Sequence, residues 1–241
     1  MIVSRKKSIP DLCIQINGCH LDQCDSYKYL GIYIDKNLNW KSHIEYTCQK
    51  VSKVCGALAK IRHSVNIDIL KNVYHALLYS YLRYGIIVWG NAAKATLEPL
   101  EVLVNKAIRI MAFIPNGNFD LSQVYKDLKL LDLPSIHKLE TAKYMYKSEK
   151  SLLPVSLGKY FEIDRCAEEH SHSTRHQALV NIPNRIAPRL KSRTKIAEKS
   201  IQFVGSTLWS QLPDDLKNSE SFTIFKRLYK NNLLELPGNN Q

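Results

Sequence analysis

The most informative stretch of this sequence is Tyr27-Lys28-Tyr29-Leu30-Gly31-Ile32-Tyr33-Ile34-Asp35. Its residues fall into two alternating sets: Tyr29, Gly31, Tyr33 and Asp35 on one parity, and Leu30, Ile32 and Ile34 on the other. Successive side chains of a β-strand point to opposite faces, so this alternation is typical of a strand. Leu38-Asn39-Trp40 closes the stretch, and helical spacing of apolar residues begins there.

A hairpin is predicted immediately upstream. Between Asp11 and Asn17 the apolar residues occupy every second position, and Asn17-Gly18 follows them. Asn-Gly after alternating apolar residues is the strongest short-range signal for a two-residue turn. Residues 1–36 are therefore predicted to form a small β element.

Three amphipathic helices are predicted over residues 37–114. The first has Asn39 as its expected N-cap and the apolar face Trp40, Ile44, Val51, Val54, Cys55, Leu58 and Ile61. The second begins near Asn66 and has the apolar face Ile67, Leu70, Tyr74, Leu77, Leu78 and Tyr81. The third has the face Leu97, Leu100, Leu103, Val104, Ala107, Ile108 and Met111. Helices with such faces pack as a three-helix bundle.

The remaining chain is predicted to be a helical region over residues 115–236. Pro115-Asn116-Gly117-Asn118 ends the third helix, and another helix is expected over roughly Ser135–Glu149. Pro154 to Arg193 reads as loops and short strands, because three prolines interrupt it. The last two helices are expected over Lys195–Trp209 and Phe222–Leu236, and residues 237–241 form a disordered tail. The fold class is mainly α.

The composition favours a nucleic-acid partner. The chain has 241 residues, 45% of them apolar, with a net charge of +12 and a pI of 9.4. Such a charge attracts nucleic acid first and an anionic membrane surface second, and a merely solvated basic surface is the plain alternative. One basic zone comprises Lys36, Lys41, Lys50, Lys53, Lys60 and Arg62, against Glu45. A second comprises Arg175, Arg185, Arg189, Lys191, Arg193, Lys195 and Lys199, against Glu198.

Particular faces of the helices carry the charge. At about 100° per residue in an α-helix, Lys53 and Lys60 fall opposite the apolar face of the first helix. Lys106 and Arg109 fall on the far side of the third. Two basic zones on a mixed scaffold indicate a surface that follows phosphates.

The six cysteines are expected to be reduced thiols in an intracellular protein, in the nucleus or the cytoplasm. Residues 1–7 carry a basic run without the apolar segment of a signal peptide. No apolar stretch approaches the ~18 residues that suggest a membrane-spanning helix. Cys166, His170, His172 and His176 could suggest zinc, but their spacing is weak and histidines in a basic loop explain it better. No phosphate-binding loop or hydrolase motif occurs, and no small-molecule substrate is expected.

Several short motifs follow one another in an order that is more specific than any one of them. They are Tyr29-Leu30-Gly31, Leu38-Asn39-Trp40, Tyr84-Gly85, Trp89-Gly90, Lys106-Ala107-Ile108-Arg109, Leu131–Pro134, Thr174-Arg175, Gly205 with Trp209, Leu212-Pro213 and Phe225-Lys226. This ordered set resembles the end of the palm, the thumb and the C-terminal region of reverse transcriptases from jockey-like non-LTR retrotransposons.

The resemblance implies a division of roles. Residues 1–36 would be a palm remnant in which Tyr29, Leu30 and Gly31 hold the primer end, and residues 37–114 would be the thumb. The thumb would clamp an RNA–DNA template–primer through Lys53, Lys60, Lys106 and Arg109. Arg175, Arg185, Arg189, Lys191 and Arg193 would form a C-terminal patch.

The same resemblance implies that the chain does not polymerise DNA. The catalytic aspartates of the family lie upstream of the point where the match begins, and the parent enzyme would use magnesium ions that this piece does not bind. Asp214-Asp215 is the one adjacent aspartate pair. It follows a proline, and acidic residues favour the N-terminal end of a helix dipole, so a helix start is expected there.

Two other roles stay open. The chain could be a nucleic-acid-binding module in its own right, or a non-functional truncated relic. In the relic, strands that have lost their sheet neighbours would favour self-association through unpaired edges.

Overall fold

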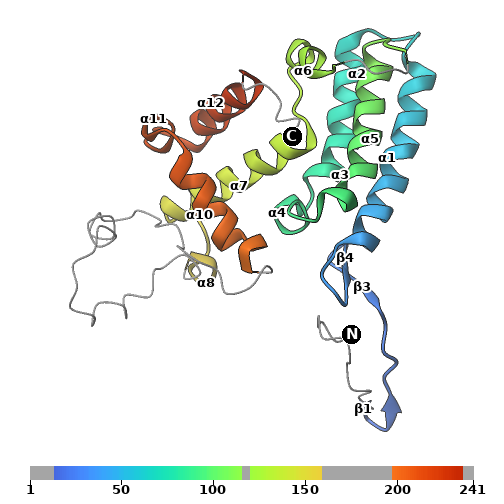
Figure 1. The fold of residues 1–241 in the computed structure, drawn as a ribbon, viewed down its shortest axis with the longest axis vertical. Coiled ribbons are helices and arrows are strands. Elements are labelled where there is room, and N and C mark those ends of the chain that lie inside the picture. The colour runs from blue at the N-terminus through green and yellow to red at the C-terminus, as the bar shows by residue number, and fades with distance from the viewer. Residues whose placement is uncertain (1–13, 116–119, 159–196, 236–241) are drawn as a thin grey trace. The chain divides into compact units, whose positions relative to one another are not determined.

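The computed structural model describes residues 14–115, 120–158 and 197–235. The chain is mainly helical with small antiparallel hairpins near its N-terminus, which confirms the predicted fold class at that level (Figure 1). It divides into two compact units. Unit 1 comprises residues 1–85 and 92–119, and unit 2 comprises residues 86–91 and 120–241.

The predicted turn at Asn17-Gly18 joins a very short hairpin. Strand β1 (Gln15–Ile16) pairs with β2 (Cys19–His20), and Gln15 lies opposite His20. Asn17 and Gly18 have φ of 51° and 78°. Two successive positive φ angles are the geometry that Asn-Gly favours in hairpins, so this prediction is confirmed.

The alternation from Tyr27 to Asp35 does not form one strand. Strand β3 (Ser26–Tyr29) turns back on β4 (Ile32–Asp35), with Tyr29 opposite Ile32. Leu30 and Gly31 make the turn with φ of 45° and 84°. The alternating pattern therefore continues through the turn without revealing it, because leucine is an unusual residue at a left-handed position.

Helix α1 (Lys41–Ile61) begins after Trp40, which takes the N-cap position expected for Asn39 and makes no side-chain cap bond. Instead, the buried Asp35 carboxylate accepts hydrogen bonds from the backbone N–H groups of Asn37, Asn39 and Trp40, at 2.7–3.2 Å. Trp40 precedes the helix with φ of 67°, and Asn39 Oδ1 accepts from the Lys41 N–H. A carboxylate from β4 thus satisfies the backbone donors that lead into α1.

The core of unit 1 lies between α1 and α5 (Lys94–Met111). From α1 it takes His43, Ile44, Thr47, Val51, Val54, Cys55 and Leu58. From α5 it takes Leu100, Val104, Ala107, Ile108 and Met111. These sets confirm most of the predicted apolar faces, but Trp40, Ile61, Leu97 and Leu103 are only half-buried.

The second predicted helix is interrupted by π-helical bonding. It consists of α2 (Ile67–Val73), the π-helix η1 (Tyr74–Tyr79) and α3 (Ser80–Arg83), and Asn66 caps α2 as expected. Its buried residues are Leu70, Tyr74, Leu78 and Leu82, whereas the predicted Ile67, Leu77 and Tyr81 are exposed. The i→i+5 bonding of a π-helix turns the chain less per residue than an α-helix does, so residues four apart stay on one face.

Unit 2 is built around α7 (Leu133–Glu149), on which α4 (Ile86–Trp89), α10 (Ile201–Gln211) and α12 (Phe222–Glu235) pack. Its other helical segments are α6 (Ser122–Leu128), α8 (Val155–Gly158), the 3₁₀ turn η4 (Ala197–Lys199) and α11 (Asp214–Lys217). The predicted α7 is confirmed, with its Asp132 cap accepting from the Ser135 N–H at 3.0 Å. The sequence did not predict α6. Helix α10 begins at Ile201 rather than near Lys195, because Ser200 caps it.

Aromatic residues from the C-terminal motifs form the core of unit 2. The Tyr146 ring stacks on Phe225 with centroids 4.6 Å apart, and its hydroxyl donates to the Ser219 carbonyl at 2.9 Å. Trp209 packs against Phe225 and donates its indole N–H to the Glu149 carboxylate. A Cβ at Gly205 would lie 2.6 Å from Met145 Sδ. These motif residues therefore hold the fold together.

Two predictions about the environment of the chain bear on the described residues. No described helix is long and apolar enough to cross a membrane. Cys19, Cys24, Cys48 and Cys55 are free thiols. Burial is the largest cause that raises the pKa of Cys48 and Cys55.

Replacing a core leucine tests the α1–α5 interface. Leu58 is fully buried, so Leu58→Ala is expected to lower the free energy of unfolding by about 2–5 kcal/mol. Leu103→Ala is the matched control, and its half-buried side chain predicts a clearly smaller loss. Urea unfolding followed by circular dichroism measures both. Equal losses would show that the core of unit 1 is assigned to the wrong face of α5.

Candidate nucleic-acid interface

The tip of the β3–β4 hairpin is docked on the end of α3. The Tyr84 hydroxyl donates a hydrogen bond to the Leu30 carbonyl. Gly31 lies against the same ring, because a Cβ built on it would be 3.2 Å from Tyr84 Cε1. Leu30 itself is 73% exposed. The motifs Tyr29-Leu30-Gly31 and Tyr84-Gly85, 54 residues apart in sequence, therefore meet in space.

Cationic and aromatic side chains alternate beside this hairpin. Lys28 Nζ lies 5.6 Å from the Tyr33 ring centroid and 5.1 Å from that of Tyr46. Lys50 Nζ lies 5.3 Å from the Tyr46 ring centroid. The two tyrosine rings are 5.1 Å apart. The sequence did not predict this cluster. Its sequence signal was the i,i+4 pair of Tyr46 with Lys50 on the predicted helix. The cross-strand pair of Lys28 with Tyr33 depends on the turn at Leu30-Gly31, which the sequence did not predict.

His43 ties the hairpin to α1. The backbone N–H of Tyr33 donates to His43 Nδ1 at 3.4 Å, and the Thr47 hydroxyl donates to the His43 carbonyl. Burial lowers the pKa of His43 from 6.5 to about 4. The imidazole is therefore neutral near pH 7. Nδ1 must be unprotonated to accept the hydrogen bond from the Tyr33 N–H, and a neutral ring allows this.

The predicted cations of α1 and α5 differ in their exposure to solvent and in whether they line a pocket. Lys53, Lys60 and Lys106 are exposed, while Arg109 is half-buried. Lys106 and Arg109 line a pocket of about 400 Å³, together with Arg62 and His63 from the end of α1. Lys53 and Lys60 do not line this pocket. Arg62 and His63 were not predicted as site residues, although Arg62 lies in the first basic zone.

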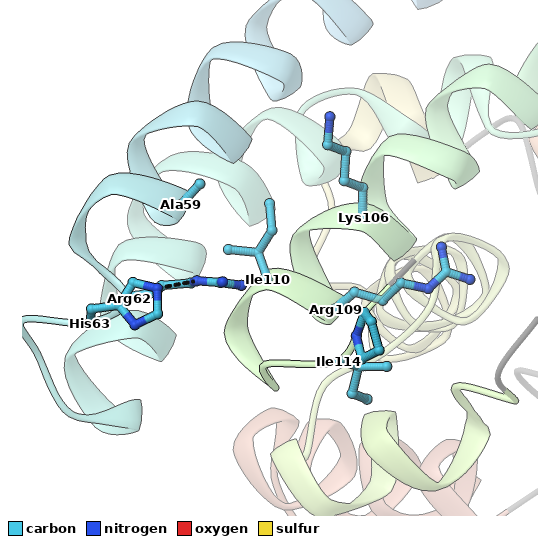
Figure 2. A pocket seen from close by; sticks show the side chains of 8 residues that line it. Ala59, Arg62, His63, Lys106, Arg109, Ile110 and Ile114 are labelled. Carbon is cyan, nitrogen blue, oxygen red and sulfur yellow. Dashed lines mark hydrogen bonds between the residues drawn. The ribbon is translucent and has the colours of Figure 1, made fainter. Parts of the chain in front are cut away.

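Figure 2 shows how the pocket is built. Lys106 and Arg109 extend from α5 in different directions, and Arg62 reaches from α1 toward Ile110. Arg62 Nε donates a hydrogen bond to His63 Nε2 at 3.0 Å. The pocket is therefore lined by the cations Arg62, Lys106 and Arg109 together with the apolar residues Ala59, Ile110, Ile114 and Pro115.

The predicted C-terminal patch lies outside the described residues. This holds for Arg175, Arg185, Arg189, Lys191 and Arg193, and also for the weak metal pattern Cys166, His170, His172 and His176. Among the described residues there is no group of three or more His, Cys, Asp and Glu that could hold a metal ion. Asp214 and Asp215 form the first turn of α11, where Lys217 Nζ lies 3.3 Å from Asp214 Oδ1, so the predicted helix start is confirmed.

Comparison with curated proteins gives relatives of one kind. An RNA-directed DNA polymerase from the mobile element jockey of Drosophila melanogaster is 29% identical over 150 residues, which is 61% of this chain and 16% of that protein. A probable RNA-directed DNA polymerase from transposon BS of the same species is 31% identical over 105 residues, or 42% of this chain and 12% of that protein. The jockey polymerase of Drosophila funebris is 30% identical over 106 residues, with the same two coverages.

These are RNA-directed DNA polymerases of jockey and other non-LTR retrotransposons. The resemblance predicted from the motifs is thereby confirmed. The chain spans only 12–16% of the length of these relatives. No protein-family model and no solved structure matches it.

Substitutions at two glycines test the docking of the hairpin tip. Gly31→Ala would strain a φ of +84° and push on Tyr84, whereas Gly18→Ala would strain a φ of +78° with nothing within 4 Å. An L side chain in the left-handed region costs roughly 1–2 kcal/mol. Gly31→Ala should therefore cost more than Gly18→Ala and should speed amide hydrogen exchange in β3 and β4. Equal effects would mean that contact with Tyr84 does not hold the tip.

The neutral His43 predicts acid sensitivity. Because the folded-state pKa is depressed, its contribution to stability is complete above pH 6.5 and is lost as the pH falls from 6.5 toward 4. The expected loss from this group is on the order of 1–3 kcal/mol. His43→Gln keeps an acceptor for the Tyr33 N–H and removes the titration, so urea midpoints of unit 1 should depend less on pH. Exposed His20→Gln is the control, and an equal effect of both would contradict this role.

Proposed function

We propose that this chain is a part of a non-LTR retrotransposon RNA-directed DNA polymerase that grips the template–primer and does not itself carry out the chemistry. The observation that supports this most is the position of Lys53, Lys60 and Lys106. They are exposed on α1 and α5, whose buried faces pack together. The homologues, which are RNA-directed DNA polymerases, make an RNA–DNA hybrid the natural partner.

In this proposal unit 1 contributes the end of the palm and the thumb. The β3–β4 hairpin, with Tyr29, Leu30 and Gly31 at its tip, holds the primer end, and the bundle follows the duplex. Lysines and arginines along a helix contact phosphates without reading the sequence. The residues of the predicted C-terminal patch, Arg175, Arg185, Arg189, Lys191 and Arg193, would add phosphate contacts of the same kind. Such a role places the protein with nucleic acid inside the cell.

The chemistry is proposed to belong to another part of the polymerase. Nucleotide addition needs carboxylates that hold two magnesium ions about 3.5–4 Å apart. The adjacent aspartates of this chain begin a short helix and lie beside Lys217, a position that suits the helix dipole. Self-association through the hairpins remains a prediction, motivated by the two separate two-stranded sheets among the described residues.

The salt dependence of binding tests the grip. An RNA–DNA hybrid titrated with the full chain should show a log–log slope of roughly −0.7 to −0.9 per phosphate contacted. Lys106→Gln with Arg109→Gln should flatten this slope by about one to two and weaken unrelated sequences equally. Fluorescence anisotropy at several salt concentrations measures both quantities.

The matched control removes two charges elsewhere. Lys129 and Lys199 are exposed residues of unit 2, and the Lys129→Gln, Lys199→Gln variant should change the slope much less. An affinity that does not change with salt concentration and that strongly favours one nucleic-acid sequence would contradict the proposal. The absence of saturable binding near physiological salt would favour the relic.

A further inference from the structure

Phe113 has a backbone conformation that phenylalanine rarely adopts. It follows α5 with φ of 56°, in the left-handed region. The Ile114 N–H donates to the Arg109 carbonyl at 3.0 Å, which closes the helix around this residue. Glycine is usual at such a position because it has no Cβ. A bulky residue held there is an observed outlier from which a functional hypothesis can be drawn.

The surroundings of the ring indicate what it does. The Arg62 guanidinium carbon lies 5.0 Å from the Phe113 ring centroid, and the His63 ring meets it edge-on at 5.3 Å. The Arg62–His63 hydrogen bond holds these two partners together. Phe113 nevertheless remains 53% exposed. Arg62 and His63 thus contact the ring, while about half of Phe113 stays open to solvent beside residues that line the pocket.

Arg62, Lys106 and Arg109 bring positive charge to the lining of the pocket. No acidic residue is among those that line it. Arg109 Nε is buried and has no hydrogen-bond partner among the described residues. Because Lys106 and Arg109 extend in different directions (Figure 2), the cations do not surround a single point. They suit a chain of phosphates better than one small anion.

We propose that the pocket and Phe113 form a site for unpaired nucleotides, in which a base stacks on Phe113 and neighbouring backbone phosphates contact Arg62, Lys106 and Arg109. An aromatic ring beside a positive groove is the combination that binds single strands without sequence preference. An acidic peptide would match the charge but would not present a base to the ring. The inference rests on the proposed function, since it takes the partner to be nucleic acid.

The test compares two probes with the full chain. One is a blunt RNA–DNA hybrid, and the other is the same hybrid with a short unpaired tail. Phe113→Gly removes the ring and relieves the left-handed backbone, and Phe113→Leu keeps an apolar side chain as a second variant. Each should lose roughly 5- to 100-fold in affinity for the tailed hybrid and much less for the blunt one. Phe113→Trp should retain tail binding.

The controls separate stacking from backbone strain and from charge. Ser151, exposed with φ of 54° in unit 2, gives the matched variant Ser151→Gly, which should not change tail binding. Unchanged tail binding by Phe113→Gly and Phe113→Leu, with blunt binding intact, would overturn this inference and leave the proposed function standing. Competition by a polyglutamate peptide would also overturn it, if the peptide displaced the tailed hybrid as effectively as an oligonucleotide of equal charge does. If the wild type binds neither hybrid, the proposed function fails with it.

Discussion

The apolar contact between α1 and α5 determines which side chains of unit 1 face solvent. Leu58 and Ile108 are fully buried in unit 1, and their helices contribute most of its core. On helices of 3.6 residues per turn, fixing one face fixes the opposite one. Lys53, Lys60 and Lys106 are exposed as a consequence of this packing. The pocket lined by Arg62 and Arg109 lies where the same two helices end. The packing of α1 on α5 therefore fixes both the core and the positions of these cations.

The hairpin is held to this bundle by polar contacts. The Asp35 carboxylate accepts hydrogen bonds from three backbone N–H groups before α1, and His43 accepts one from β4. The Tyr84 hydroxyl donates to the carbonyl at the hairpin tip. An unpaired polar group is costly to bury, so the buried Asp35 and His43 depend on these partners. A two-stranded hairpin is only marginally stable alone. The tip that we propose to hold the primer end is therefore positioned by α1 and by the end of α3.

The sequence predicted the elements whose signals are local. Short sequence patterns, within a few residues of one another, predicted the turn at Asn17-Gly18, the buried face of α5 and the Asn66 cap. It did not predict the π-helical turn at Tyr74–Tyr79 or the turn inside Tyr27–Asp35, because neither changes the local pattern of apolar residues. The contact of Arg62 and His63 with Phe113 depends on residues about 50 positions apart, which no periodicity reveals. The cations were therefore predictable as a set, but their arrangement around a pocket was not.

Several left-handed residues other than glycine lie in unit 1 where the chain turns or where it enters or leaves a helix. Leu30 forms the hairpin tip, Leu38 and Trp40 flank the Asp35 carboxylate, and Phe113 ends α5. At each place a side chain occupies a position where glycine would relax the backbone. Hydrogen bonds to Asp35, Tyr84 and Arg109 hold these conformations in place. Leu30 and Phe113 are both exposed, so in these two cases the strained backbone directs an apolar side chain to solvent and adds nothing to the core. Strained backbone conformations are found at ligand-binding sites, and both residues lie in the unit that we propose to grip nucleic acid.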